Sequence, residues 1–168
     1  MINKKGFTLV ELLVAATIIG FLAAFATAQY RSSVAEARWT RAKSQTDQLA
    51  AALQRMYLDY PTSGIINGGE MSNTSSSEQC QIFVGQQNGV SITQLIACGF
   101  LENSDWSSEY FRYYSCFNTA GMWPECSSSY RACMAARTTA KLPSSYKTKK
   151  YCVDLSGVGQ ELNKTTNY

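Results

Sequence analysis

The chain has 168 residues, of which 45% are hydrophobic, and it carries a formal net charge of +3 at pH 7. This length fits one compact domain with an appended segment, and a mean hydropathy of -0.18 excludes a protein embedded in the membrane throughout. Without Lys4 and Lys5 the net charge is only +1, so nucleic acid is poorly supported as the main partner.

The cysteine and histidine content narrows the chemistry further. The chain has six cysteines and no histidine, and no two cysteines have the C-x-x-C spacing, so the usual zinc ligand sets are largely unavailable. An even number of cysteines downstream of a membrane-targeting segment favours disulfides formed outside the cytoplasm. We therefore expect neither a metal nor another cofactor. The cysteines are Cys80, Cys98, Cys116, Cys126, Cys133 and Cys152.

The first predicted element is an apolar run of 22 residues from Phe7 to Ala28. As a helix it would be about 33 Å long, which is enough to cross a bilayer once. Its only ionisable side chain is Glu11. A charge near the middle of a membrane helix costs roughly 2.5–3.5 kcal/mol, so this carboxylate requires an explanation.

Two ordinary interpretations of the run leave Glu11 unexplained. As a cleaved secretory signal, the run has a basic start and an A-x-A site from Ala26 to Ala28, just before Gln29. As a plain signal anchor, it is long enough to span the bilayer with the lysines left in the cytoplasm. Both interpretations are penalised by the charge.

The residues around Glu11 supply a third interpretation. The stretch KKGFTLVE closely resembles the class III leader of type IV pilins and their pseudopilin relatives. The resemblance implies that a prepilin peptidase cuts between Gly6 and Phe7 and methylates the amino group of Phe7. It also implies that Glu11 pairs with the amino terminus of a neighbouring subunit, because two charges that are each costly in an apolar core offset one another when paired. A snorkelling position near the membrane edge is the alternative for Glu11.

Beyond Ala28 the helical pattern continues and becomes amphipathic, with one apolar stripe. Pro61 disfavours a helical Tyr60 and begins a turn-rich segment. The pattern therefore predicts one helix from Phe7 to about Leu58, too long for a globular domain alone. The stripe consists of Ala35, Trp39, Ala42, Thr46, Leu49, Leu53, Met56 and Tyr60.

Two positions decide how straight this helix is. Many pilins carry proline at the position of Ala28, and this chain does not, so we predict no sharp kink there. Gly20 is the main weak point, at roughly 1 kcal/mol relative to alanine, and we expect any unwinding in a filament to begin near it.

The rest of the chain is predicted to form a head with an antiparallel sheet. Ser91 to Gly99 reads as a short helix, with Ser91 and Gln94 forming a capping box and Gly99 ending it. Three segments read as strands, although the second also suits a helix. The strands are Tyr110–Cys116, Ser129–Ala135 and Lys149–Leu155, separated by turn signals at Gly121–Pro124 and Leu142–Ser145.

The fold class is therefore α+β, with a long helix packed on a small antiparallel sheet, as in pilins. We expect a leader at 1–6, an apolar transmembrane and filament-core helix at 7–28, an amphipathic helix half at 29–60 and a head at 61–168, divided into a loop region at 61–108 and a sheet at 109–168. Hairpin geometry favours disulfides Cys133–Cys152 and Cys116–Cys126, leaving Cys80–Cys98, although six cysteines allow 15 pairings.

Few other motifs suggest a ligand. There is no histidine for a general base, no G-x-S-x-G and no Walker-type loop, so an enzyme is not expected. The basic and aromatic cluster KTKKY at 147–151 could contact DNA or an acidic surface, but a solvated strand edge is the simpler interpretation. Weaker matches are a glycosylation sequon at Asn73–Ser75 and carboxylates for calcium at Asp154 and Glu161.

The resemblance implies a structural subunit of a type IV pilus, either major or minor. It implies as partners other copies and other pilins, the prepilin peptidase, the inner-membrane assembly platform and, before assembly, the lipid bilayer. The chain would first lie in the inner membrane with its head outside the cytoplasm, and later in an extracellular pilus. The alternatives are a type II secretion pseudopilin and a secreted, disulfide-rich binding domain.

Overall fold

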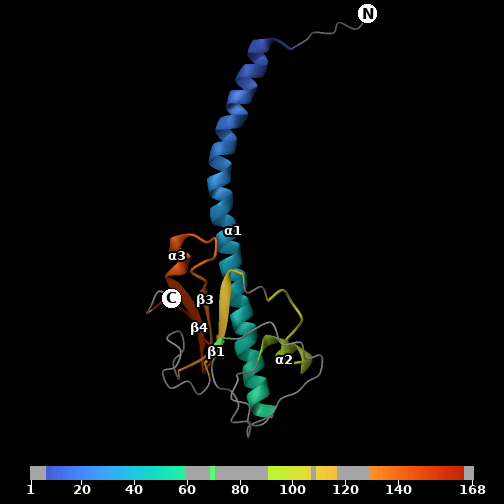
Figure 1. Ribbon diagram of the computed structural model, residues 1–168, viewed down its shortest axis with the longest axis vertical. Coiled ribbons are helices and arrows are strands. Elements are labelled where there is room, and N and C mark those ends of the chain that lie inside the picture. Colours follow the sequence, from blue (N-terminus) through green and yellow to red (C-terminus); the bar gives the residue numbers. More distant parts are fainter. Residues whose placement is uncertain (1–6, 60–68, 71–90, 107–108, 117–128, 165–168) are drawn as a thin grey trace, which may run out of the picture. The chain divides into compact units, whose positions relative to one another are not determined.

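The computed structural model describes residues 7–59, 69–70, 91–106, 109–116 and 129–164 (Figure 1). Its elements follow one another in the order α1, β1, α2, β2, β3, α3, β4, β5. The chain divides into two compact units, Met1–Arg38 and Trp39–Tyr168. The described part of the first unit is almost entirely helical, whereas the second contains the sheet.

The helix α1, Leu9–Asp59, has 51 residues and confirms the predicted helix to within two residues at its start and one at its end. Its apolar stripe also behaves as predicted, because every described member from Ala35 to Met56 is buried. The one polar member, Thr46, donates its hydroxyl hydrogen to the carbonyl oxygen of Ala42 at 2.8 Å. A buried hydroxyl with such a partner avoids the cost of an unsatisfied polar group.

The sheet has five antiparallel strands in the order β1-β2-β3-β4-β5. All three predicted strands are confirmed to within one residue at each end, and the segment that also suited a helix is strand β3. The strands are β1 Gly69–Glu70, β2 Phe111–Ser115, β3 Tyr130–Ala136, β4 Lys149–Asp154 and β5 Gly159–Asn163.

Three elements were not predicted. β1 and the edge strand β5 lack the β-branched and aromatic residues that indicate strands, and β5 forms because a tight turn returns the chain along β4. The short helix α3, Ser144–Lys147, begins after Pro143 inside a segment that we expected to be a turn. The expected turn at Gly121–Pro124 lies outside the described residues.

The core of the second unit lies between α1 and one face of the sheet. Strand register puts Tyr113, Met134 and Tyr151 side by side on that face. The indole of Trp39 meets the ring of Phe111 with centroids 5.9 Å apart. Figure 1 shows the strands gathered beside the second half of α1. The apolar stripe of α1 from Trp39 to Met56 is thus buried within the second unit.

The short helix α2, Ile92–Ala97, begins with the predicted capping box. The Ser91 hydroxyl accepts from the amide of Gln94 at 3.1 Å, and the Gln94 side-chain oxygen accepts from the amide of Ser91 at 2.9 Å. The helix ends before Gly99, which has a φ of 73°, a conformation that glycine adopts without the steric cost of a Cβ. Both predicted ends of this helix are confirmed.

The opposite face of the sheet is also buried and contains a disulfide. Cys133 of β3 and Cys152 of β4 are register partners joined by a disulfide, with their Cα atoms 4.0 Å apart, so this predicted pair is confirmed. Cys98 takes part in a disulfide, and so does Cys116. Cys80 and Cys126 lie outside the described residues, so the remaining predicted pairs stay predictions. The buried cluster on this face comprises Tyr114, Cys116, Cys133, Ala135 and Cys152.

Candidate functional site

Glu11 lies in the first turn of α1 and is held there by Thr8. Its Oε2 accepts hydrogen bonds from the Thr8 amide and the Thr8 hydroxyl, both at 2.9 Å. The Glu11 amide in turn donates to the Thr8 hydroxyl oxygen at 3.3 Å. These reciprocal bonds form a capping box, so the carboxylate has a structural role within its own helix.

The capping role of Thr8 was not predicted, although its signal is present in the sequence. A threonine followed three residues later by glutamate, ahead of an apolar run, is the sequence signature of a capping box. The box does not exhaust the acceptor capacity of the carboxylate. A carboxylate has about four acceptor positions, and all the contacts described for Glu11 use a single oxygen. A further cationic donor can therefore bind the same group.

The apolar side chains that follow Glu11 have no cover within the chain. Every residue from Phe7 to Thr27 is exposed, and Phe7 itself is 83% exposed. By length and composition α1 is able to cross a membrane, and none of its most apolar window is buried. An exposed apolar surface of this extent requires a membrane or a protein partner.

Gly20 and Ala28 both lie inside α1, which continues through them without interruption. A Cβ built on Gly20 meets no heavy atom within 4 Å. No described contact inside the chain therefore requires a glycine at this position. The predicted absence of a break at Ala28 is confirmed for the single chain.

In the head, Glu161 of β5 binds α1. Its Oε1 accepts from the indole nitrogen of Trp39 at 3.1 Å and from Lys43 Nζ at 2.9 Å, while Oε2 lies 3.6 Å from Lys149 Nζ. The hydrogen bond from Lys43, followed by that from Trp39, lowers the pKa of Glu161. Both carboxylate oxygens are thus engaged by donors, which leaves little room for the calcium ion considered from the sequence.

Asp154, the other carboxylate considered for calcium, is occupied by its own turn. Its Oδ1 accepts from the amide and hydroxyl of Ser156 at 2.9 and 2.6 Å and from the amide of Val158 at 2.8 Å. These bonds lower the pKa of Asp154, the Ser156 side chain contributing most. Within the described residues, no group of three or more histidine, cysteine, aspartate or glutamate side chains is arranged to hold a metal.

Tyr151 of β4 makes a second connection between the sheet and α1. Its hydroxyl donates to Asp47 at 2.8 Å, and burial together with this bond raises the pKa of Tyr151 to about 12. The ring passes directly over Gly159 of β5. A Cβ at that position would lie 1.7 Å from the Tyr151 hydroxyl oxygen, so only glycine leaves room for this contact.

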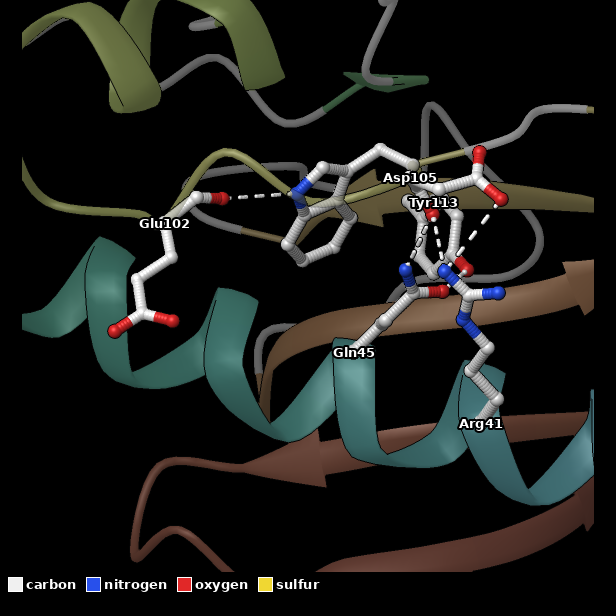
Figure 2. A network of polar contacts seen from close by, with 6 residues as sticks. Arg41, Gln45, Glu102, Asp105 and Tyr113 are labelled. Carbon is white, nitrogen blue, oxygen red and sulfur yellow. Dashed lines mark hydrogen bonds and ion pairs between the residues drawn. The ribbon is translucent and has the colours of Figure 1, made fainter.

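Figure 2 shows a third connection, in which a loop after α2 is tied to α1 and β2. Gln45 donates to the carbonyl oxygen of Asp105 at 2.7 Å and accepts from the Tyr113 hydroxyl at 2.6 Å. Arg41 lies 3.5 Å from the Asp105 carboxylate. Beside them, the Trp106 ring meets Tyr113 edge-on with centroids 5.6 Å apart. Burial raises the pKa of Tyr113, so this hydroxyl remains a hydrogen-bond donor over the physiological range.

The basic and aromatic cluster around KTKKY is largely used by the fold. Tyr146 packs against Trp39 with centroids 5.6 Å apart, and Tyr151 is bound to Asp47. Lys150 is 8% exposed. Because stacking of bases needs accessible aromatic rings, these contacts argue against the nucleic-acid interpretation of the cluster.

Comparisons with known proteins found one matching family model and several related proteins. The prokaryotic N-terminal methylation motif matches residues 1–27. The type IV major fimbrial protein FimA of Dichelobacter nodosus is 41% identical over 61 residues, which are 36% of this chain and 39% of that protein. A fimbrial protein of Pseudomonas aeruginosa is 35% identical over 82 residues, 49% of this chain and 48% of that protein.

The chain thus spans less than half the length of these relatives, and no solved structure matches it significantly. The methylation motif falls on the segment that contains the exposed apolar helix, and the α+β architecture is the one that the resemblance implied. The amino-terminal segment thus carries the methylation motif, and the chain is similar to type IV fimbrial proteins over part of its length.

Proposed function

We propose that the chain is a structural subunit of a type IV pilus, not an enzyme. The observation that carries the proposal is an exposed apolar helix segment with a single carboxylate in its first turn. Such a segment suits two successive environments. A bilayer covers its apolar side chains before assembly, and the helices of sister subunits cover them afterwards.

Cleavage of the leader would create the positively charged amino terminus with which Glu11 is proposed to pair. Cleavage between Gly6 and Phe7 creates an ammonium group at Phe7, one residue before the Thr8 cap. In a filament, the amino terminus of one subunit would reach the Glu11 carboxylate of a neighbour. The capping box holds Oε2 in a defined direction, and the carboxylate keeps acceptor capacity for the incoming ammonium. The pair would set the axial register of the helices.

Gly20 is the proposed point of flexibility. No described contact within the chain uses the missing side chain, and glycine weakens a helix by roughly 1 kcal/mol relative to alanine. The helix would be continuous in the single subunit and would unwind near Gly20 where neighbouring helices crowd it.

The proposed partners are other copies of the chain and other pilins, with the prepilin peptidase and the inner-membrane assembly platform acting earlier. The head would lie outside the cytoplasm throughout. A type II secretion pseudopilin is the second candidate, since it shares the leader. A binding domain released after Ala28 is disfavoured, because a cleaved secretory signal leaves the Glu11 carboxylate within its apolar run unexplained.

The deciding experiment tests leader cleavage and filament assembly on the same material. Filaments sheared from producing cells are imaged by electron cryo-microscopy, and their subunit is analysed by mass spectrometry of the amino-terminal peptide. We expect this chain in the filament, starting at an N-methylated Phe7. A soluble product that starts at Gln29, or filaments that lack the chain while it accumulates in the membrane, would overturn the proposal.

A further inference from the structure

A small pocket lies in the second unit, where the segment after α2 meets the carboxyl-terminal part of α1. Its volume is about 280 Å³. Ala51 and Ala52 of α1 leave room for it, because their side chains are only methyl groups, and Leu101 adds a buried apolar side chain to its lining. Arg55 and Glu102 line the same pocket. It therefore suits an apolar group that lies next to a charged one.

The two charged residues of the pocket have no ion pair among the described residues. Figure 2 shows the Glu102 carboxylate directed toward α1 and away from the polar network, to which Glu102 contributes only its carbonyl oxygen, bound by Trp106 at 3.3 Å. Arg55 is exposed. Because a guanidinium has five donors and no acceptor, Arg55 is available to an anionic group of a partner.

The turn between β4 and β5 presents the complementary features. Leu155 is 50% exposed and Val158 is 58% exposed. The turn is fixed by Asp154, whose Oδ1 accepts from Ser156 and Val158, and by the Leu155 amide, which donates to the carbonyl oxygen of Ser129 at 3.2 Å. The described bonds to the Asp154 side chain use Oδ1 alone, so Oδ2 can accept from a cation. A turn fixed in this way loses little conformational entropy on binding.

The pocket and the turn lie on opposite sides of α1 within the second unit. Lys43 and Asp47 of α1 bind side chains of β5 and β4, whereas Arg41 and Gln45 bind Asp105 in the segment after α2. Residues two apart on a helix point about 200° apart. Figure 1 likewise shows α2 and the strands on different sides of α1. One head therefore cannot fill its own pocket with its own turn.

The pocket and the turn also lie at the same level along α1. Gln54 of α1 accepts a hydrogen bond from Arg131 of β3, and the preceding residue, Tyr130, is the register partner of Asp154. The turn that follows Asp154 thus lies level with Gln54, and the pocket includes Arg55. Two heads placed side by side would bring the turn of one to the pocket of the other.

We propose that heads of neighbouring copies dock sideways, with Leu155 of one head in the pocket of the next and the Asp154 carboxylate paired with Arg55 of that next head. The inference rests on the filament of the proposed function. A second copy fits the pocket because the chain itself supplies the apolar side chain and the opposite charge. The two surfaces differ, so the contact is heterologous, and its repetition gives a ring or an open helical filament.

The test is disulfide cross-linking in filaments of the full-length chain. Ala51→Cys and Leu155→Cys are introduced together, sheared filaments are treated with a mild oxidant, and the products are separated without reductant. We expect a ladder of multimers. Each single variant should stay monomeric, because the thiol of the facing surface is missing and no described cysteine is free. The matched control joins Leu155→Cys to Lys141→Cys, an exposed position outside the pocket, and should also stay monomeric.

Charge variants of the pocket test the sign of the partner. In the cross-linking background, Arg55→Gln should lower the yield of multimers several-fold, whereas Arg55→Lys should largely keep it. Glu102→Gln removes the opposite charge from the same pocket and should not lower the yield. Equal losses in Arg55→Gln and Glu102→Gln would overturn the pairing with an anionic turn.

Filament yield provides a second measurement that does not depend on introduced thiols. Leu155→Asp should lower the yield several-fold and Leu155→Met should keep it, with the circular dichroism of both variants unchanged because Leu155 is half exposed. Normal yield from Leu155→Asp would overturn the inference. Filaments of the double cysteine variant without a ladder, or cross-links to a different protein, would overturn it while leaving the proposed function in place. Failure of the unmodified chain to enter filaments would contradict the proposed function itself.

Discussion

The Cys133–Cys152 disulfide is predicted to be a main source of stability in the head. The perturbation is the double variant Cys133→Ala with Cys152→Ala, which removes the bond without leaving a lone thiol. The two cysteines are separated by 19 residues in sequence. Closing a loop of that length lowers the entropy of the unfolded chain enough to stabilise the head by about 3 kcal/mol. Both cysteines are fully buried, so lost packing adds to the loss.

The assay is urea unfolding of the full-length chain in detergent, followed by tryptophan fluorescence. Trp39 and Trp106 are buried in the second unit and report its unfolding. We expect a lower midpoint, and a steeper dependence on urea because the unfolded chain without the bond exposes more surface. A matched single variant, Val153→Ala, lowers the midpoint by packing alone and leaves the slope unchanged. A loss below about 1 kcal/mol in the double variant would refute the reasoning from loop closure.

Four further results are expected. Glu11→Gln retains a side chain that can cap the helix but loses the charge, so membrane levels should stay normal while filaments become scarce on electron micrographs; abundant filaments would remove the pairing role. Gly20→Ala strengthens the helix by roughly 1 kcal/mol and should lower filament yield without affecting the single subunit, which circular dichroism and filament counts distinguish. Gly159→Ala would place a Cβ against the Tyr151 hydroxyl and should lower the melting temperature of the head, whereas Gly159→Ala in a Tyr151→Phe background should lower it less. The pKa of Glu161 is lowered in the folded chain, so the ionised carboxylate stabilises the fold above a pH of about 4.3, and this stabilisation is lost as the pH falls through the pKa of the folded state. Glu161→Gln should therefore make the melting temperature depend less on pH in the acidic range. An unchanged pH dependence would contradict this.

Elements with strong local signals could be read from the sequence. The stripe of α1 repeats at helical spacing, and α2 carries both its capping box and its terminal glycine, so their bounds were predicted closely. β5 could not be found this way, because its five residues are mostly polar and its strand form depends on pairing with β4. Tertiary contacts decide the structure of such a segment, and its own preferences do not.

The residues of the candidate site likewise include some that the sequence indicated and some that it did not. Glu11 stood out because a charge in an apolar run is costly, whereas Thr8 was missed although the T-x-x-E spacing was visible. The bonds from Trp39 and Lys43 to Glu161 join residues 122 and 118 positions apart. No spacing rule reaches so far along a chain. The sequence therefore indicated Glu161 only as an isolated carboxylate.

The edge strand β5 matters if many copies of the chain are packed together, as the proposed filament requires. An open strand edge is a template for unwanted pairing with another chain, and proteins protect such edges with short strands and inward-pointing charges. β5 has only five residues, and its one charged side chain, Glu161, points toward α1 and is neutralised there. In the proposed filament, neighbouring heads would thus touch along their sides without adding strands to one another, which would keep ordered assembly separate from amyloid-like aggregation.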